Sequence, residues 1–256
     1  MSSTHSSRDL TPHPLDGPVA AALSGTPIAR FGRGVRLGAP IFLGYVPVGI
    51  AFGILARTLG FTVLQAVLCS ATALAGAGQF IALSFLGAGA GAASVLIATT
   101  VVNLRYVLFA STLSPHLRDV PTPIQAMLAF SLTDETFAVN IADRRAGLST
   151  PAAMVGVGAV AWCGWVLGTL MGAAGAGWIG DPSRFGVAFA MPAMFVALFI
   201  ALAEDWRHVV VGAAAGAIVL ALPLLGSLGL SIGSSWYLVI ASIGAATVGA
   251  AVWRED

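Results

Sequence analysis

Long apolar runs recur along the chain from residue 34 almost to its C-terminal end. A run of about 20 apolar residues matches the hydrocarbon thickness of a bilayer when it is helical. Only 9% of the residues are charged, compared with about a quarter in soluble domains, and 57% are hydrophobic. The sequence therefore predicts an all-α, polytopic membrane helix bundle of about eight transmembrane segments, some of them kinked or broken, at roughly residues 37–56, 62–87, 93–112, 123–142, 152–176, 185–203, 208–227 and 234–252.

A polar tail precedes this membrane domain. Residues 1–33 are rich in Ser, Pro, Thr and His, a composition typical of disorder. Pro18 and Pro27 interrupt the stretch 17–29, which lacks the continuous apolar core of a secretory signal peptide. We therefore expect a disordered cytoplasmic tail at 1–33 and a transmembrane domain at 34–256.

Arginines that flank the segments indicate the orientation, because short cytoplasmic loops carry an excess of positive charge. With the N-terminus inside, the outer side holds Arg57, Arg118 and Arg184. The inner side holds more of them, namely Arg8, Arg30, Arg33, Arg36, Arg144, Arg145, Arg207 and Arg254. We expect a multi-pass protein with both termini in the cytoplasm.

Several function classes find no support in the sequence. The net charge of +1 gives no basis for nucleic-acid binding. Cys69 and Cys163 lie inside apolar runs without metal-ligand spacing, so neither a metal site nor a disulfide framework is indicated. Hydrolase and phosphate-binding motifs are absent from the sequence. We therefore expect a protein that is not an enzyme and has no cofactor.

Two neighbouring segments carry charge at membrane depth. Asn103 and Arg105 lie in the third segment, and Asp134 and Glu135 in the fourth. A charge at the centre of a membrane helix costs roughly 2.5–3.5 kcal/mol on insertion scales, so it usually has a partner or a task. An ion pair between Arg105 and Asp134 is geometrically possible. Glu135 would then remain as the group that gains and loses a proton. Alternatively, Arg105 extends towards the interface and the pair only holds helices together.

A glycine-rich stretch in the second segment offers a different kind of polar site. Gly76 and Gly78 weaken the helix there, and Gln79 is polar at membrane depth. If the helix breaks, the exposed amides of the following half-helix would attract an anion such as an amino-acid carboxylate. The alternative is a continuous helix with a small face, in which Gln79 bonds to a neighbour.

Prolines and spaced glycines predict local features of the bundle. Pro47 and Pro192 lie within segments, where proline frees a helix carbonyl. They indicate helix breaks in an inverted repeat, with simple kinks as the competing interpretation. Close helix approach is predicted where glycines are spaced by four, at Gly49/Gly53, Gly164/Gly168/Gly172 and Gly212/Gly216. An interfacial aromatic belt is predicted from Trp162, Trp165, Trp178, Trp206, Trp236 and Trp253.

These motifs, in this order, resemble the AzlC family of branched-chain amino acid permeases. The resemblance runs from about residue 37 to 250 and is carried by Gly44-Tyr45-Val46-Pro47-Val48-Gly49, Ala75-Gly76-Ala77-Gly78-Gln79-Phe80, Asn103-Leu104-Arg105, Thr133-Asp134-Glu135 and Phe189-Ala190-Met191-Pro192-Ala193-Met194-Phe195. The family commonly has a His after Asn-Leu-Arg, where this chain has Tyr106. The resemblance implies export of branched-chain and related hydrophobic amino acids, in a cell (inner) membrane, with a small AzlD-type membrane protein as companion.

The sequence therefore leads to the hypothesis of a proton-driven amino-acid exporter. Asp134 or Glu135 would take up protons. Arg105 or the helix start at Gly76, Gly78 and Gln79 would hold the substrate carboxylate, Asn103 would orient it, and an apolar pocket would read the side chain. The alternative is a non-catalytic membrane subunit that stabilises or regulates a partner transporter, in which case these charges are assembly contacts.

Overall fold

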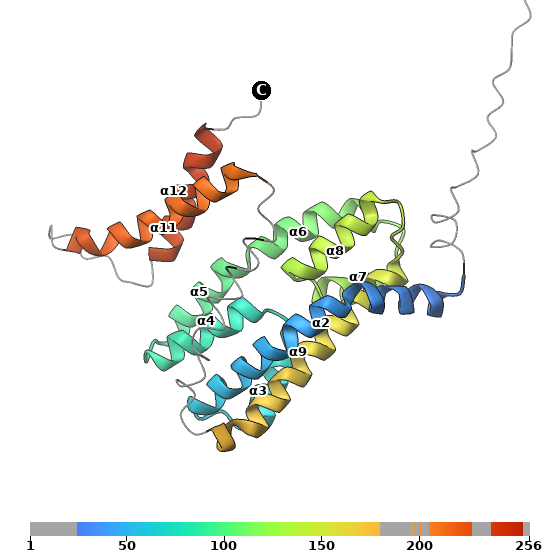
Figure 1. The fold of residues 1–256 in the computed structure, drawn as a ribbon, viewed down its shortest axis with the longest axis horizontal. Helices are drawn as coiled ribbons and strands as arrows, with labels where there is room; N and C mark the ends of the chain where they lie inside the picture. The colour runs from blue at the N-terminus through green and yellow to red at the C-terminus, as the bar shows by residue number, and fades with distance from the viewer. Residues whose placement is uncertain (1–24, 180–195, 197–199, 201–204, 227–236, 253–256) are drawn as a thin grey trace, which may run out of the picture. The chain divides into compact units, whose positions relative to one another are not determined.

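The computed structural model describes residues 25–179, 196, 200, 205–226 and 237–252, and these ranges contain helices and no strand. Figure 1 shows the helices along the chain. They are α2 (Pro27–Thr58), α3 (Val63–Thr72), α4 (Gly76–Gly87), α5 (Ala92–Asn103), α6 (Arg105–Leu113), α7 (Thr122–Phe130), α8 (Asp134–Arg145), α9 (Pro151–Ile179), α11 (Trp206–Gly226) and α12 (Tyr237–Val252), with a 3₁₀ turn at Ser114–His116.

The all-helical, membrane-spanning character predicted from the sequence is confirmed. Within the described ranges, four helical stretches are long and apolar enough to cross a bilayer: Pro27–Thr58, Ala92–His116, Pro151–Trp178 and Trp206–Pro223. The count of eight and the inverted repeat are not confirmed. The predicted segments at 62–87 and 123–142 are each two short helices, and most of the segment at 185–203, with Pro192, lies outside the described residues.

The chain forms two compact units. Unit 1 comprises residues 1–45 and 109–164, and unit 2 comprises residues 46–108 and 165–256. Both α2 and α9 contribute their first part to unit 1 and their second part to unit 2. The polar motifs are therefore divided, with 133–135 in unit 1 and both 75–80 and 103–105 in unit 2.

Unit 1 is built on close packing of α2 against α9 (Figure 1). Gly34 lies against the backbone of Ala153, and Gly164 lies against Phe42, so the two helices run parallel. A methyl group at either glycine would overlap the facing helix, which explains why small residues are needed there. A core formed by Leu113, Leu128, Leu132 and Met154 fills the rest of the unit.

In unit 2, the second parts of α2 and α9 also pack closely. Gly49 and Gly53 face α9 near Gly168 and Gly172, as their four-residue spacing predicts. By contrast, a methyl group at Gly216 on α11 would meet nothing within 4 Å, so close packing at that residue is not present among the described atoms. Helix α4 packs against α5, and α11 packs against α12.

Two boundary predictions differ from the structure. Helix α2 begins at Pro27, so residues 27–33 of the predicted tail are helical, and Arg33 at the end of this stretch binds Asp143 and the carbonyl of Leu148. The predicted helix break at Pro47 is wrong, since α2 is continuous through this residue. A proline removes one backbone donor, and the helical hydrogen bonds on both sides of it hold the segment together.

Candidate functional site

Two of the three polar motifs lie where a helix is interrupted. Residues 73–75 separate α3 from α4, and residues 131–133 separate α7 from α8. Leu104, between α5 and α6, keeps helical backbone angles, and Ala92–His116 is one stretch long enough to cross a bilayer. Non-helical backbone at membrane depth is tolerated only where protein covers it or where it lines a water-filled cavity. The interruptions therefore mark the places where polar side chains and free backbone groups can meet a substrate.

The first interruption settles the alternatives for the glycine-rich stretch in favour of a break. Helix α3 ends at Thr72, and α4 begins at Gly76. Ala75 is the N-cap residue of α4 and supplies no side-chain hydrogen bond, and the first turn contains no acidic residue. The first amides of a helix have no intrahelical partner and carry the positive end of its dipole. The start of α4 is therefore suited to an anion.

Asn103 lies against this first turn of α4. A Cβ atom at Gly78 would be 2.8 Å from Nδ2 of Asn103, so only glycine lets the amide come this close. The Oδ1 atom of Asn103 is buried and accepts no hydrogen bond from the residues that the structure describes. The structure thus brings together two of the predicted site residues, Gly78 and Asn103. The Oδ1 atom of Asn103 can accept a hydrogen bond from a bound substrate.

Gln79 is more firmly held than the sequence indicated. Its side chain is 6% exposed, and its Oε1 accepts a 2.7 Å hydrogen bond from the indole Nε1 of Trp165. Its Nε2 donates to the sulfur of Cys69 over 3.4 Å. The alternative interpretation, a glutamine bonded to neighbours, therefore describes its side chain, while its backbone still belongs to the first turn of α4.

Trp165 corrects the predicted aromatic belt. It is 1% exposed and packs in a cluster of three rings with Phe52 and Phe80, whose ring centroids are 6.1 and 6.4 Å away. A Cβ atom at Gly76 would be 2.9 Å from its ring, so the indole also supports the start of α4. Its position in the middle of an apolar segment was the available signal, because a buried indole N–H needs an acceptor.

Arg105 is the first residue of α6. Its guanidinium lies 5.3 Å from the ring centroid of Tyr106. This distance is within the range of a cation–π contact. Tyr106 stands where the AzlC family, which the sequence resembles, commonly has a histidine. Arg105 belongs to unit 2 and Asp134 to unit 1, so their ion pair stays a prediction.

Asp134 and Glu135 form the first turn of α8. Thr133 is the N-cap, and its hydroxyl accepts from the backbone N–H of Thr136, whose hydroxyl in turn accepts from the N–H of Thr133. Asp134 is 8% exposed, and Glu135 is partly buried. Both carboxyl groups thus lie at the N-terminal end of α8, where the helix dipole presents its positive end.

A tyrosine that sequence analysis did not single out completes this group. The hydroxyl oxygen of Tyr45 lies 2.5 Å from Oε2 of Glu135 and 2.8 Å from Oγ1 of Thr133. Tyr45 is 8% exposed and comes from α2. A phenol in the middle of an apolar run was the signal that could have identified it, since a buried hydroxyl requires a partner.

Comparison with known proteins agrees with these motifs. The profile of the AzlC protein family matches residues 40–179, which is more than half of the chain and includes all the polar groups described above. The chain belongs to the AzlC family. No solved structure shows significant similarity to it.

Relatives of this AzlC-family chain are membrane proteins. The inner membrane protein YgaZ of Escherichia coli K12 is 32% identical over 77% of the chain and 84% of its own length. An uncharacterized membrane protein of Archaeoglobus fulgidus is 32% identical over 77% of the chain and 86% of its own length. The branched-chain amino acid transport protein AzlC of Bacillus subtilis is 30% identical over 65% of the chain and 64% of its own length. The activity named among these relatives is transport.

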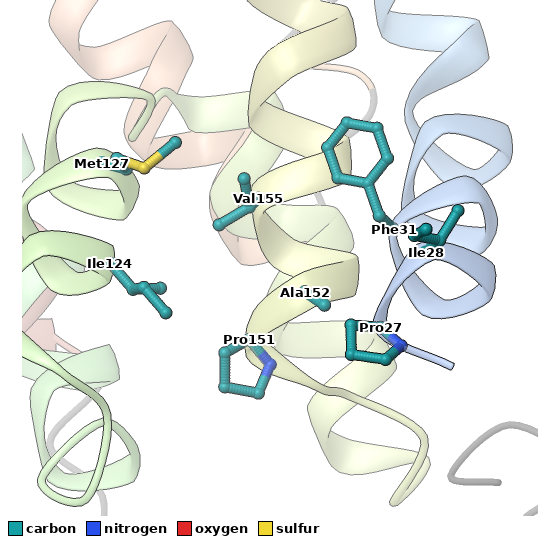
Figure 2. Close-up of a pocket in the computed structure, with 8 residues that line it drawn as sticks. All are labelled: Pro27, Ile28, Phe31, Ile124, Met127, Pro151, Ala152 and Val155. Carbon is teal, nitrogen blue, oxygen red and sulfur yellow. The ribbon is translucent and has the colours of Figure 1, made fainter. Parts of the chain in front are cut away.

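Unit 1 of the AzlC-family chain also has an open apolar hollow of about 350 Å³ (Figure 2). The N-terminal ends of α2, α7 and α9 line it, through Pro27, Ile28, Phe31, Ile124, Met127, Pro151, Ala152 and Val155. None of these side chains could bind the charged groups of an amino acid. The hollow is therefore a poor candidate for the whole substrate.

Proposed function

We propose that the chain is a membrane transporter that exports branched-chain and related hydrophobic amino acids, driven by the proton gradient. The observation that carries the proposal is the uncapped start of α4, with the buried amide of Asn103 against it. Such a site at a broken membrane helix is typical of carboxylate binding in secondary transporters. Membership of the AzlC family and the name of the Bacillus relative support the substrate class.

In this proposal the substrate carboxylate binds at the first turn of α4. The backbone of Gly76 and Gly78 allows close approach, and the N–H groups there point at the anion. Asn103 orients the substrate through its amide, and Arg105 adds positive charge. Gln79 acts through its backbone, since its side chain already bonds to Trp165.

Protons enter through the acidic first turn of α8. Asp134 or Glu135 binds a proton in one state and releases it in another, which couples transport to the gradient. Their partly or wholly buried surroundings support this role, because intramembrane carboxylates mark proton pathways. An apolar pocket reads the substrate side chain, and discrimination among leucine, isoleucine and valine is modest, since one methylene is worth about 1–3 kcal/mol.

The proposal includes an orientation and a companion. The contact of Arg33 with Asp143 and the carbonyl of Leu148 places the start of α2 beside the α8–α9 connection within unit 1. Both elements are rich in arginine, at Arg30 and Arg36 and at Arg144 and Arg145, which supports a shared cytoplasmic side. A small AzlD-type membrane protein completes the transporter in the inner membrane.

An efflux assay in cells that lack their own branched-chain amino acid exporters tests the proposal. The cells are loaded with a leucine-containing dipeptide, peptidases release leucine, and its appearance outside is followed. The chain is expressed alone, with its small companion, and as Asp134→Asn. We expect efflux from the wild type and a loss to background in Asp134→Asn at equal membrane abundance.

Comparing expression of the chain alone with expression alongside the small companion distinguishes a transporter from a non-catalytic subunit. Efflux that needs both proteins and Asp134 supports a two-component transporter. Full activity of Asp134→Asn refutes the role of this carboxylate. An absence of efflux with both proteins well expressed refutes the substrate class, and normal transport by a charge-neutral Arg105/Asp134 double variant favours a subunit whose charges are assembly contacts.

A further inference from the structure

We propose that Tyr45 is the positioning residue of Glu135, and that its phenol transmits the protonation of Glu135 to the helix break at residues 131–133. The inference rests on the proposed function in one respect, the use of Glu135 as a proton-coupling group. It adds a residue from a different helix and a physical link between the proton and the backbone.

The phenol lies between two groups that can each give or take a hydrogen bond. The Tyr45 oxygen is 2.5 Å from Oε2 of Glu135 and 2.8 Å from Oγ1 of Thr133. A phenol has one proton, so it donates to one neighbour and accepts from the other. If one neighbour has no proton to donate, Tyr45 must donate to that neighbour and accept from the other.

An ionised Glu135 fixes one direction. A carboxylate only accepts, so Tyr45 donates to Glu135 and Thr133 donates to the phenol oxygen. A protonated Glu135 can donate to Tyr45, which then turns its own proton to Thr133. Thr133 is left to donate elsewhere, and the hydroxyl oxygen of Thr136 lies 3.3 Å from it.

Thr133 connects this change to the backbone. Its hydroxyl caps α8 by accepting from the N–H of Thr136, while the hydroxyl of Thr136 donates to the carbonyl of Ser131 over 2.8 Å. These bonds hold the non-helical residues 131–133 between α7 and α8. Protonation of Glu135 thus rearranges the hydrogen bonds that define the break, which is where a hinge between half-helices would act.

The described residues of unit 1 hold several other ionisable groups, among them Arg144 and Arg145 in the last turn of α8 and His116, Arg118 and Asp119 between α6 and α7. Asp134 is the neighbour of Glu135 on α8, and Asp143 at the far end of that helix pairs with Arg33 of α2. Helix α7 carries no ionisable side chain, and the unit 1 part of α9 carries only Cys163. The first part of α2 adds Arg30 and Arg36, which precede Tyr45 by at least nine residues.

The test uses purified full-length protein in liposomes, with its companion. Leucine efflux is measured against pH for the wild type, Tyr45→Phe, Glu135→Gln and the double variant. Tyr237→Phe, which removes a phenol hydroxyl from α12, is the matched control. A second readout needs no transport: the infrared C=O stretching band of the protonated carboxyl group, identified by its loss in Glu135→Gln and titrated in each variant.

We expect Tyr45→Phe to move the midpoint of the efflux profile and of the infrared titration to higher pH by about one unit, because a hydrogen bond to a charged acceptor is one of the stronger kinds. Tyr237→Phe leaves both midpoints in place. In the Glu135→Gln background, Tyr45→Phe has no further effect on the pH profile, since the group it positions is gone.

Three results overturn the inference: midpoints unchanged in Tyr45→Phe, additive effects of Tyr45→Phe and Glu135→Gln, or no infrared band that depends on Glu135. If the wild type moves no leucine but the Glu135 band shifts in Tyr45→Phe, the proposed function fails and the role of Tyr45 stands. If leucine transport depends on protons but Tyr45→Phe changes neither the efflux midpoint nor the infrared midpoint, the proposed function stands and only the role of Tyr45 fails.

Discussion

The helix breaks before α4 and before α8 have the same form and opposite chemistry. Both place a short non-helical stretch between two half-helices, at residues 73–75 and 131–133. At the break before α8, residues of the chain itself complete the helix start. Thr133 caps the helix, and Asp134 and Glu135 supply negative charge at the positive end of its dipole. The break before α4 has an alanine at the cap and no acidic residue in the first turn.

This difference indicates separate tasks for the two breaks. The start of α8 is capped by Thr133 and carries two carboxyl groups that disfavour a further anion, so we propose that it handles protons rather than the substrate carboxylate. The start of α4 leaves amides for an incoming anion, and its glycines and the packed indole of Trp165 keep side chains out of the way. The comparison can be tested by making each break resemble the other.

Giving α4 the charge of α8 has the largest expected effect. Ala75→Asp places a carboxylate at the start of α4, where we propose that the substrate carboxylate binds, and two such charges about 5 Å apart repel by roughly 3 kcal/mol at an effective dielectric constant of about 20. We expect leucine efflux to fall by about 100-fold. Ala75→Asn is the uncharged control and should lose far less. Equal efflux from Ala75→Asp and wild type would place the substrate carboxylate elsewhere.

Filling the space against Asn103 has the next largest effect. Gly78→Ala adds a Cβ atom 2.8 Å from Nδ2 of Asn103 and forces this amide to move. We expect the substrate concentration for half-maximal efflux to rise about tenfold, since small displacements of orienting groups are costly. Gly175→Ala on α9, whose added methyl meets nothing within 4 Å, is the control. A similar rise in both variants would point to general helix effects.

The bond between Trp165 and Gln79 gives a stability prediction for unit 2. Trp165→Phe leaves Oε1 of Gln79 buried without its donor, which costs about 1–3 kcal/mol beyond the lost ring contacts. Adding Gln79→Met removes the stranded acceptor, so the double variant should unfold at a higher temperature than Trp165→Phe. Thermal unfolding in detergent measures this. A less stable double variant would mean that Gln79 has another essential partner.

Removing the cap of α8 has the smallest expected effect. Thr133→Ala loses the hydroxyl that accepts from the N–H of Thr136 and should lower stability by about 0.5–2 kcal/mol. Thr133→Ser keeps this bond and should retain the stability of the wild type. The same thermal measurement applies, and equal losses in Ala and Ser variants would show that the Thr133 methyl group matters rather than the cap.

The sequence indicated the apolar helices, because runs of bilayer length follow from local composition, but it located the breaks only in part. A break at Gly76, Gly78 and Gln79 was one of two alternatives, and residues 123–142 were expected to form one continuous segment, so the break before α8 was not predicted. Trp165 is 86 residues from Gln79, and Tyr45 is 90 residues from Glu135. Such pairs depend on which helices pack together, which no local pattern specifies.

Pro47 illustrates the opposite error. A proline inside an apolar run is a good local signal for a break, yet α2 continues through it. Close packing of Gly49 and Gly53 against α9 stabilises the helix on the C-terminal side of the proline, so tertiary contacts outweigh one missing backbone donor. The break before α8 occurs instead where local polar groups satisfy the freed backbone, as Thr133 and Thr136 do.

Proton-driven transport in purified liposomes tests the central claim most directly. The chain and the proposed AzlD-type companion are reconstituted, a pH gradient is imposed, and labelled leucine is followed across the membrane. We predict that leucine accumulates against its concentration gradient, that a protonophore abolishes this accumulation, and that Asp134→Asn and Glu135→Gln lower it while the proteins remain folded. Accumulation that ignores the pH gradient, or that survives loss of both carboxylates, would contradict the account.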